Sequence, residues 1–213
     1  MDKLTLVIGN KNYSSWSMRP WIVMKYFQIP FEEIFIPLRQ PGSKEKILEH
    51  SPAGKVPVLK HQNLAIWETI AICEYLAEIF PAKNLWPKDQ KARAVARAVV
   101  AEMHAGFMDL RKNCPMNVKA SKPMKEFSPE VSRDIERITA LWEDCRKRFG
   151  SRGDFLFGEF SIADGFYAPV VWRFNTYGAK LSGTAKKYFE TMMSLPVMKE
   201  WKDLAVKEKY VIE

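Results

Sequence analysis

The sequence predicts a molecule in two parts, an α/β first half followed by an all-helical second half. Short apolar runs alternate with helical patterns over roughly the first eighty residues. A stretch with two prolines at 80–90 interrupts this alternation, and helical periodicity alone continues from there to the C-terminus. The 213 residues are enough for one large domain or two small ones. A boundary between two such parts is a favoured place for a small-molecule site.

The first half begins with a strand, a helix and a second strand. The run LTLVIG at 4–9 is short and β-rich, MRPWIVMKYFQI at 18–29 has apolar residues at helical spacing, and FEEIFIPL at 31–38 alternates. Pro20 lies near the expected start of the helix, where a missing N–H costs little. This order predicts a parallel strand pair with a right-handed crossover.

The remainder of the first half adds two helices and a hairpin. SKEKILEH at 43–50 is expected to form a short polar helix. VPVLKH at 56–61 and LAIWE at 64–68 predict a strand pair joined by a tight turn. TIAICEYLAEIF at 69–80 has the apolar spacing of an amphipathic helix that covers the sheet.

The second half is predicted to contain helices only. Ser128 followed by Pro129 marks one helix start, because serine caps a helix and proline suits its first position. Ser161 and Asp164 have capping-box spacing, with Asp in place of the usual Glu, so Asp164 is expected to serve folding. The expected helices span 91–111, 128–149, 161–174, 184–194 and 197–208.

Composition argues against several classes of protein. With 47% hydrophobic and 27% charged residues, the chain fits a soluble globular protein. No stretch approaches the ~18 apolar residues of a membrane helix, and the N-terminus lacks a signal core, so we expect a cytoplasmic protein without a membrane partner. Three cysteines without a CxxC pair disfavour zinc and disulfide redox sites, so no metal is expected. The net charge of +8 is scattered among acids, which does not favour nucleic-acid binding.

The segment SSWSMRP at 14–20 stands between the first strand and the first helix. A serine there is a good N-cap, because its oxygen accepts a free helix N–H. A helix N-terminus also stabilises negative charge. A thiolate placed there and accepting a Ser hydroxyl bond of about 1.5–3 kcal/mol would have its pKa lowered by about one to two units. The serine cluster could therefore cap the helix, stabilise a thiolate, or do both.

Two further segments are suited to binding an extended peptide. A cis Val56–Pro57 peptide would turn the Val56 backbone towards an open sheet edge, where a peptide could pair as an added strand. An ordinary edge-strand proline is the alternative. Thr69 at a helix start would offer N–H groups to a carboxylate, and Glu68 would bind an ammonium. The alternative is a cap beside a solvated acid.

Taken together, these segments resemble the glutathione transferase superfamily over nearly the whole chain. GKVPVL is similar to the family's cis-proline segment, WETIAICEYLAE to its Glu-Ser/Thr helix start, and FSIADGFYAP to the capping-box motif of its second domain. The resemblance implies a thioredoxin-like βαβαββα domain over 1–82, a linker over 83–87 and an all-helical domain over 88–213 that lines a second-substrate pocket. It also implies glutathione as co-substrate, a small electrophile, detoxification and a homodimer.

The resemblance also assigns residues to the glutathione site. Val56 and Pro57 would contact the cysteinyl part of the tripeptide, Glu68 and Thr69 its γ-glutamyl head, and Lys55 its glycine end. SSWSMRPW is most similar to the serine-type motif of the zeta class, with Trp16 where that class has cysteine and with Arg19 at the family's spacing from the leading serine. Arg19 is therefore also expected at the glutathione site.

By the same register Ser14 is the activating hydroxyl, Ser15 is a supporting donor or the cap, and Tyr13 is a rival activator. The missing cysteine weighs against reactions through a mixed disulfide. The residues expected around the second-substrate pocket are Tyr13, Trp16, His104, Arg111, Cys114 and Asn117. Three functions stay open: a transferase, a maleylacetoacetate isomerase-like enzyme, and a non-catalytic glutathione-binding or regulatory protein.

Overall fold

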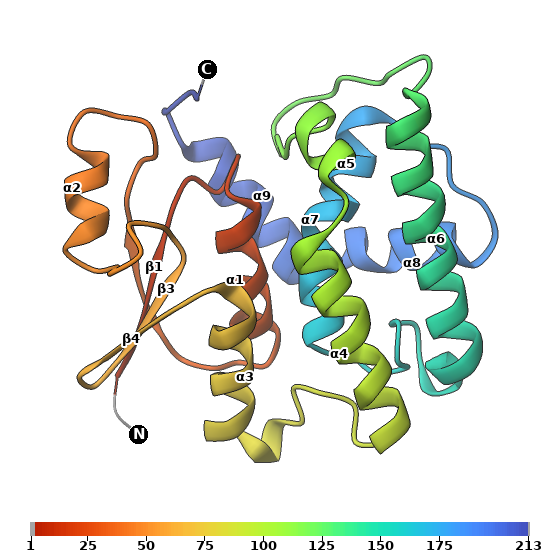
Figure 1. Cartoon of the computed structure of the whole chain (residues 1–213), viewed down its shortest axis with the longest axis horizontal. Coiled ribbons are helices and arrows are strands. Elements are labelled where there is room, and N and C mark those ends of the chain that lie inside the picture. Colours follow the sequence, from red (N-terminus) through yellow and green to blue (C-terminus); the bar gives the residue numbers. More distant parts are fainter. Residues whose placement is uncertain (1–2, 213) are drawn as a thin grey trace.

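A computed structural model describes residues 3–212 and contains a four-stranded sheet beside an array of helices (Figure 1). The strand order is β2-β1-β3-β4, with β2 parallel to β1 and both other pairs antiparallel. The βαβαββα order expected from the sequence is confirmed. Its elements are β1 (Leu4–Ile8), α1 (Ser15–Tyr26), β2 (Glu32–Phe35), α2 (Ser43–Leu48), β3 (Val58–His61), β4 (Leu64–Trp67) and α3 (Thr69–Ile79).

The two faces of the sheet are covered by different helices. In Figure 1, α2 lies on the outer side of the sheet, while α1 and α3 lie between the sheet and the helical half. Leu6 and Ile8 of β1 join the large core on the α1 and α3 side, whereas Val7 packs in a small cluster with Ile47 of α2. Successive residues of a strand point to opposite faces, so one apolar strand supplies both cores.

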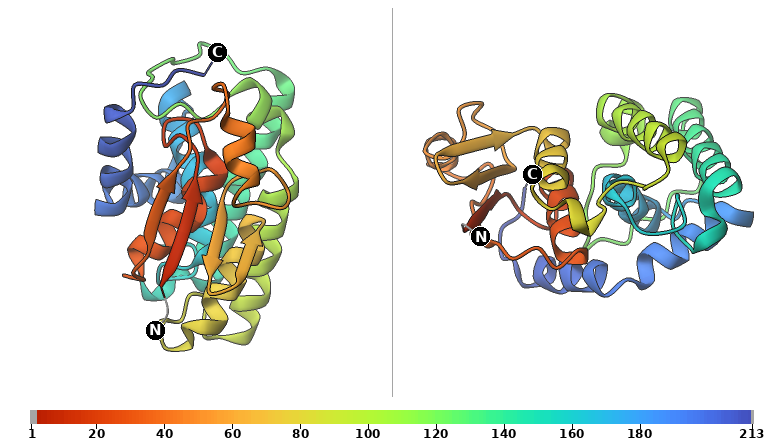
Figure 2. Two further views of the ribbon diagram at one scale, coloured as in Figure 1. Left: turned by 90° about the vertical axis from the view of Figure 1, so that its left-hand side faces the viewer. Right: turned by 90° about the horizontal axis from the view of Figure 1, so that it is seen from below.

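The second half consists of helices, and its last helix returns to the first half (Figure 2). The Trp201 ring of the last helix meets Trp21 of α1 edge to face, with ring centroids 5.0 Å apart. The elements are a 3-10 turn (Pro81–Lys83), α4 (Gln90–Ala105), α5 (Met108–Asn113), α6 (Pro129–Phe149), a 3-10 turn (Gly150–Arg152), α7 (Ile162–Tyr177), α8 (Gly183–Ser194) and α9 (Pro196–Lys207).

Helix α7 joins the halves by packing directly on α1. A Cβ at Gly165 would lie 2.5 Å from Cγ2 of Val23, so only glycine permits this approach. The predicted capping box is confirmed: Asp164 Oδ2 accepts the Ser161 N–H at 2.8 Å, and the Ser161 side chain caps the first turn. Asp164 also accepts the Leu156 N–H at 3.1 Å, which ties the preceding loop to α7.

Three boundary predictions were wrong. The expected helix 91–111 is two helices, because the chain breaks at Gly106 and at Phe107, whose φ is +60°. Helix α1 begins at Ser15, so Pro20 lies inside it rather than near its start. Glu68, with φ +64°, is the N-cap of α3, and Thr69 is its first residue rather than its cap.

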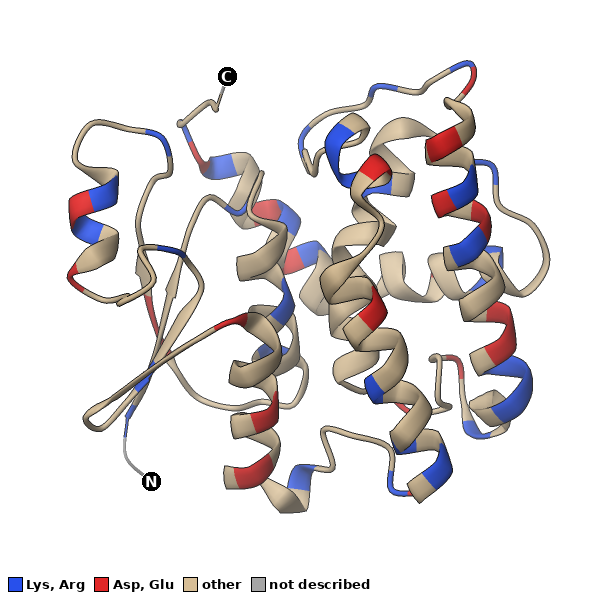
Figure 3. Ribbon diagram, in the orientation of Figure 1, with Lys and Arg blue, Asp and Glu red and all other residues tan. Residues whose placement is uncertain are grey.

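Charges of both signs alternate on the outer helices. Figure 3 shows lysine or arginine next to aspartate or glutamate along α2 and α6. Several of these form surface ion pairs, such as Arg137 with Glu102 at 2.8 Å and Arg148 with Asp144 at 2.9 Å. Between residues 3 and 212, none of the helices is both long and apolar enough to cross a bilayer.

Candidate functional site

Ser14 caps α1, as one interpretation of the serine cluster predicted. Its Oγ accepts the Ser17 N–H at 3.2 Å and lies within hydrogen-bond distance of Ser17 Oγ, at 2.8 Å. Ser17 Oγ also accepts the Gly9 N–H at 3.1 Å, so the three-residue network fixes the end of β1 to the start of α1. Ser14 is only 8% exposed.

The loop before Ser14 is held by the C-terminal end of the chain. The Glu208 carboxylate accepts the Lys11 N–H at 2.7 Å and the Asn12 N–H at 3.4 Å. Trp201 Nε1 donates to the Lys11 carbonyl at 2.8 Å. The Ser14 N–H in turn donates to the Asn10 carbonyl at 2.7 Å. The position of the α1 N-terminus therefore depends on residues almost two hundred positions away in the sequence.

A cavity of about 450 Å³ opens between the first half and α4, next to the start of α1. The Val56–Pro57 peptide on its wall is cis. It lies just before β3, which pairs with β1 and β4 and is therefore an inner strand rather than the edge strand that the sequence suggested. Glu68 is half-exposed at the mouth and has an unusual positive φ for a residue with a side chain. The lining residues are Trp16, Lys55, Val56, Pro57, Trp67, Glu68, Thr69, His104 and Ala105.

His104 of α4 lines this cavity from the helical half of the molecule. Its Nε2 lies 3.6 Å from Oε2 of Glu68, and its ring meets the Trp16 ring edge to face at 5.1 Å between centroids. Burial lowers the pKa of His104, with further lowering by Arg19 and Arg111, against which Glu68 acts to raise it. The imidazole is therefore a neutral group at neutral pH.

Three arginines lie behind the cavity wall. Arg19 Cζ is 4.1 Å and Arg111 Cζ 5.0 Å from the centroid of the Trp16 ring. Arg173 Nη2 donates to Ser15 Oγ at 3.4 Å. Burial, reinforced by Arg111, lowers the pKa of Arg173 to about 10. Arg173 was not among the residues predicted from the sequence, although a lone arginine within the apolar run GFYAPVVWRF is a usable signal.

Seven of the residues expected at a glutathione or substrate site line the same cavity. These seven are Trp16, Lys55, Val56, Pro57, Glu68, Thr69 and His104. Trp67 and Ala105 also line it and were not anticipated, because neither carries a polar group that a sequence pattern would single out.

Other expected residues do not line the cavity. Arg19 has no exposed surface and does not line the cavity, so its expected contact with a ligand stays a prediction. Cys114 is fully buried 4.0 Å from the Met124 sulfur, and burial raises its pKa, so it is not an activated thiol. The others that lie outside the lining are Tyr13, Ser14, Ser15, Arg111 and Asn117.

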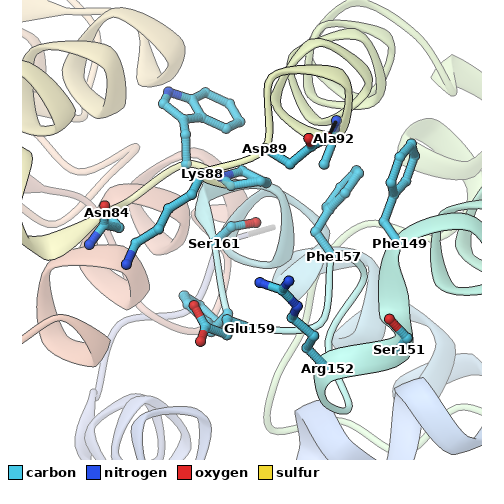
Figure 4. Close-up of a pocket in the computed structure, with 13 residues that line it drawn as sticks. Asn84, Lys88, Asp89, Ala92, Phe149, Ser151, Arg152, Phe157, Glu159 and Ser161 are labelled. Carbon is cyan, nitrogen blue, oxygen red and sulfur yellow. Dashed lines mark hydrogen bonds between the residues drawn. The ribbon is translucent and has the colours of Figure 1, made fainter.

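A second cavity, of about 320 Å³, lies between the segment before α4 and the loop after α6 (Figure 4). Lys88, Arg152 and Glu159 surround its opening, and Ser161 lies at its floor. The three charged residues are all exposed to solvent, and Ser161 is already committed to the capping box. The buried polar group of this cavity is therefore already in use. The cavity beside α1 is the candidate site because it gathers residues of the cis-proline segment and of the α3 start.

Comparison with known proteins points to one family. The model of the glutathione S-transferase N-terminal domain matches residues 13–79, and that of the C-terminal domain matches residues 128–203. A probable maleylacetoacetate isomerase of Caenorhabditis elegans is 30% identical over 187 residues, covering 85% of each chain.

Two further similarities concern a second sequence relative and a solved structure, respectively. A stringent starvation protein A homolog of Pasteurella multocida is 28% identical over 157 residues, covering 70% of this chain and 66% of its own. The crystal structure of a glutathione transferase homolog from Burkholderia with bound glutathione has a TM-score of 0.73 and 23% identity, and covers 97% of this chain and all of its own. This structural similarity supports the fold.

Proposed function

Because the chain belongs to the glutathione S-transferase superfamily, we propose that it binds glutathione in the cavity beside α1 and directs the thiolate at a small electrophile. The observation that carries this proposal is the lining itself. Residues of the cis-proline segment and of the α3 start face one cavity at the N-terminal end of α1. A metal or organic prosthetic group has no role in the proposed reaction.

The lining suits the two ends and the middle of the tripeptide. The Val56 N–H and C=O pair with the cysteinyl backbone as an added strand would. Glu68 binds the ammonium of the γ-glutamyl head, while Thr69 and the N-terminal N–H groups of α3 bind its carboxylate. Lys55 meets the glycine carboxylate. This orientation directs the cysteinyl sulfur towards the start of α1.

Ser14 is the proposed donor to the sulfur. A hydroxyl rotates and has one proton and two lone pairs, so the bond between Ser14 and Ser17 can run in either direction. If Ser17 donates, Ser14 accepts two hydrogen bonds and its own proton is free for a thiolate. The positive end of α1 adds to this stabilisation. The thiol proton leaves to solvent, and the thiolate then attacks the electrophile.

The test is the pKa of bound glutathione, followed by thiolate absorbance during a pH titration. Ser14→Ala should leave binding largely intact and raise the thiol pKa by about one to two units. Ser194→Ala, which removes an exposed serine on α8, is the matched control. A shift seen with Ser15→Ala or Tyr13→Phe, and absent with Ser14→Ala, would assign the role to that residue instead.

A second candidate function is glutathione binding without transfer. It is favoured by the position of Ser14, which is largely buried and lies outside the cavity lining. Retention on immobilised glutathione, combined with an unshifted thiol pKa in the bound state, would support this candidate.

The third candidate function is that of a maleylacetoacetate isomerase-like enzyme, and it rests on the similarity to the Caenorhabditis elegans protein. Turnover of maleylacetone with glutathione would support it. The cysteine that accompanies the paired serines in the zeta-type motif is Trp16 here. A transferase is therefore the first choice. We further propose that the protein is a cytoplasmic homodimer. Size-exclusion chromatography with light scattering would test the dimeric state.

A further inference from the structure

The cavity between the segment before α4 and the loop after α6 has the features of a separate binding site. Its volume of about 320 Å³ is at the lower end of the range for small-molecule sites, ~300–1,000 Å³. None of the residues that line it also lines the cavity beside α1. A ligand bound here would therefore be small, and its binding does not depend on glutathione.

Three charged side chains surround the opening of this cavity without pairing. Lys88 precedes α4, Arg152 belongs to the turn after α6, and Glu159 precedes α7. Within residues 3–212 the ion pairs involve other side chains, so Glu159 is not within ion-pair distance of either cation. The carboxylate of Asp89, which also lines the cavity, accepts the Ala92 N–H at 2.8 Å as the cap of α4. Opposite charges that face one cavity without meeting can both be paired by a ligand that carries both signs.

The apolar part of the lining is aromatic. Phe149 and Phe157 stack with their ring centroids 5.6 Å apart and their planes at 29°, and Figure 4 shows both rings on the same side of the cavity as Arg152. Trp86 also lines the cavity, and its Nε1 already donates to Glu74 at 3.0 Å. Aromatic rings pack well against other rings in offset or edge-to-face contacts. The lining therefore favours a ligand with an aromatic ring.

Backbone contacts hold the charged walls of the cavity in place. Arg93 Nη1 donates to the Lys88 carbonyl at 2.8 Å. Arg146 Nη1 donates to the carbonyl of Gly153, the residue after Arg152, at 3.0 Å. The segments that carry the two cations are thus fixed before a ligand arrives, which lowers the entropic cost of binding.

We propose that this cavity binds the zwitterion of an aromatic α-amino acid. The carboxylate lies between Lys88 and Arg152, the ammonium pairs with Glu159, and the ring packs against Phe149 and Phe157. A guanidinium fork matches a carboxylate in geometry and charge. An aromatic anion would leave Glu159 facing a like charge, and an aromatic amine would do the same to the two cations. A zwitterion satisfies all three groups.

The first test compares probes that each lack one part of the amino acid. Hydrocinnamate keeps the ring and the carboxylate of L-phenylalanine, phenethylamine keeps the ring and the ammonium, and L-alanine keeps both charges without the ring. A ligand that binds only the folded state raises the melting temperature, and the dependence on its concentration gives the Kd. The Kd of L-phenylalanine should be at least about tenfold lower than that of each other probe. No stabilisation by L-phenylalanine, or equal stabilisation by hydrocinnamate, would overturn the proposal.

Variants locate the binding at this cavity. Arg152→Met and Glu159→Gln change exposed side chains, and each should weaken L-phenylalanine binding about tenfold. Glu159→Gln should not weaken hydrocinnamate binding, because that probe has no ammonium. Lys91→Met removes an exposed cation of α4 outside the lining and is the control for net charge. If the control weakens binding as much as Arg152→Met, or if both cavity variants bind as the wild type does, the site is refuted. A failure to bind glutathione, with L-phenylalanine binding intact, would count against the glutathione proposal alone.

Discussion

Replacement of Asp164 by alanine should destabilise the protein and leave glutathione affinity unchanged. The carboxylate is fully buried and accepts the N–H groups of Ser161 at 2.8 Å and of Leu156 at 3.1 Å. Alanine leaves both donors buried without a partner, at about 1–3 kcal/mol each. We therefore expect a loss of about 2–6 kcal/mol for the two donors, compared with about 1 kcal/mol for a simple helix cap.

The loss should also depend on pH. Burial raises the pKa of Asp164 to about 6, although its hydrogen bonds act to lower it. Its value in the unfolded chain is about 3.9, so the native state binds more protons between about pH 4 and 6. This contribution to the stability of the wild type is fully present below about pH 4 and disappears as the pH rises through 6. The difference between wild type and variant should therefore be larger at pH 4.5 than at pH 7.5.

Urea unfolding at both pH values measures this, with calorimetric titration of glutathione as the check on binding. Asp164→Asn keeps one acceptor and lacks the charge, so its loss should be smaller than that of alanine, and it should lack the pH dependence that Asp164 supplies. An alanine variant as stable as the wild type, or a difference that grows with rising pH, would refute the reasoning.

Two further changes act on the contacts between the halves. Gly165→Ala should destabilise by about 1–3 kcal/mol, since the new Cβ would lie 2.5 Å from Val23 Cγ2, and a double variant with Val23→Ala should recover part of this loss in urea unfolding. The Glu208 carboxylate accepts the N–H groups of Lys11 and Asn12, so Glu208→Ala should speed amide hydrogen exchange at both residues. It should also lower the turnover rate, because the loop that positions Ser14 is then held less firmly. Glu200→Ala on α9, which removes a surface pair with Lys25, should leave this exchange unchanged. Unchanged exchange in the Glu208 variant would show that the loop is held without it.

Local rules predicted much of the fold. The capping box at Ser161 and Asp164 and the helix start at Ser128 depend on residues a few positions apart, and both are confirmed. The break at Gly106 and Phe107 was missed because the sequence around it keeps an apolar helical period, and the left-handed conformation of Phe107 is not one its residue type favours.

The site was predictable only in part. The cavity lining at Lys55, Val56, Glu68 and Thr69 follows short motifs that resemble a family, so the sequence could indicate it. The inward bond of Ser14 depends on Ser17 and Gly9, and the position of the three arginines behind the cavity wall depends on how α5 and α7 pack against α1. These arrangements are set by tertiary contacts, which a pattern of neighbouring residues does not specify.

Calorimetric titration of glutathione into the wild type and into Glu68→Gln tests the binding site most directly. Glu68 is half-exposed at the mouth of the cavity, where it would pair with the ammonium of the tripeptide. We expect measurable binding to the wild type and an affinity at least about tenfold lower for the variant, since a charge-assisted bond is lost. No binding to the wild type, or equal affinity for both proteins, would contradict the assignment of glutathione to this cavity.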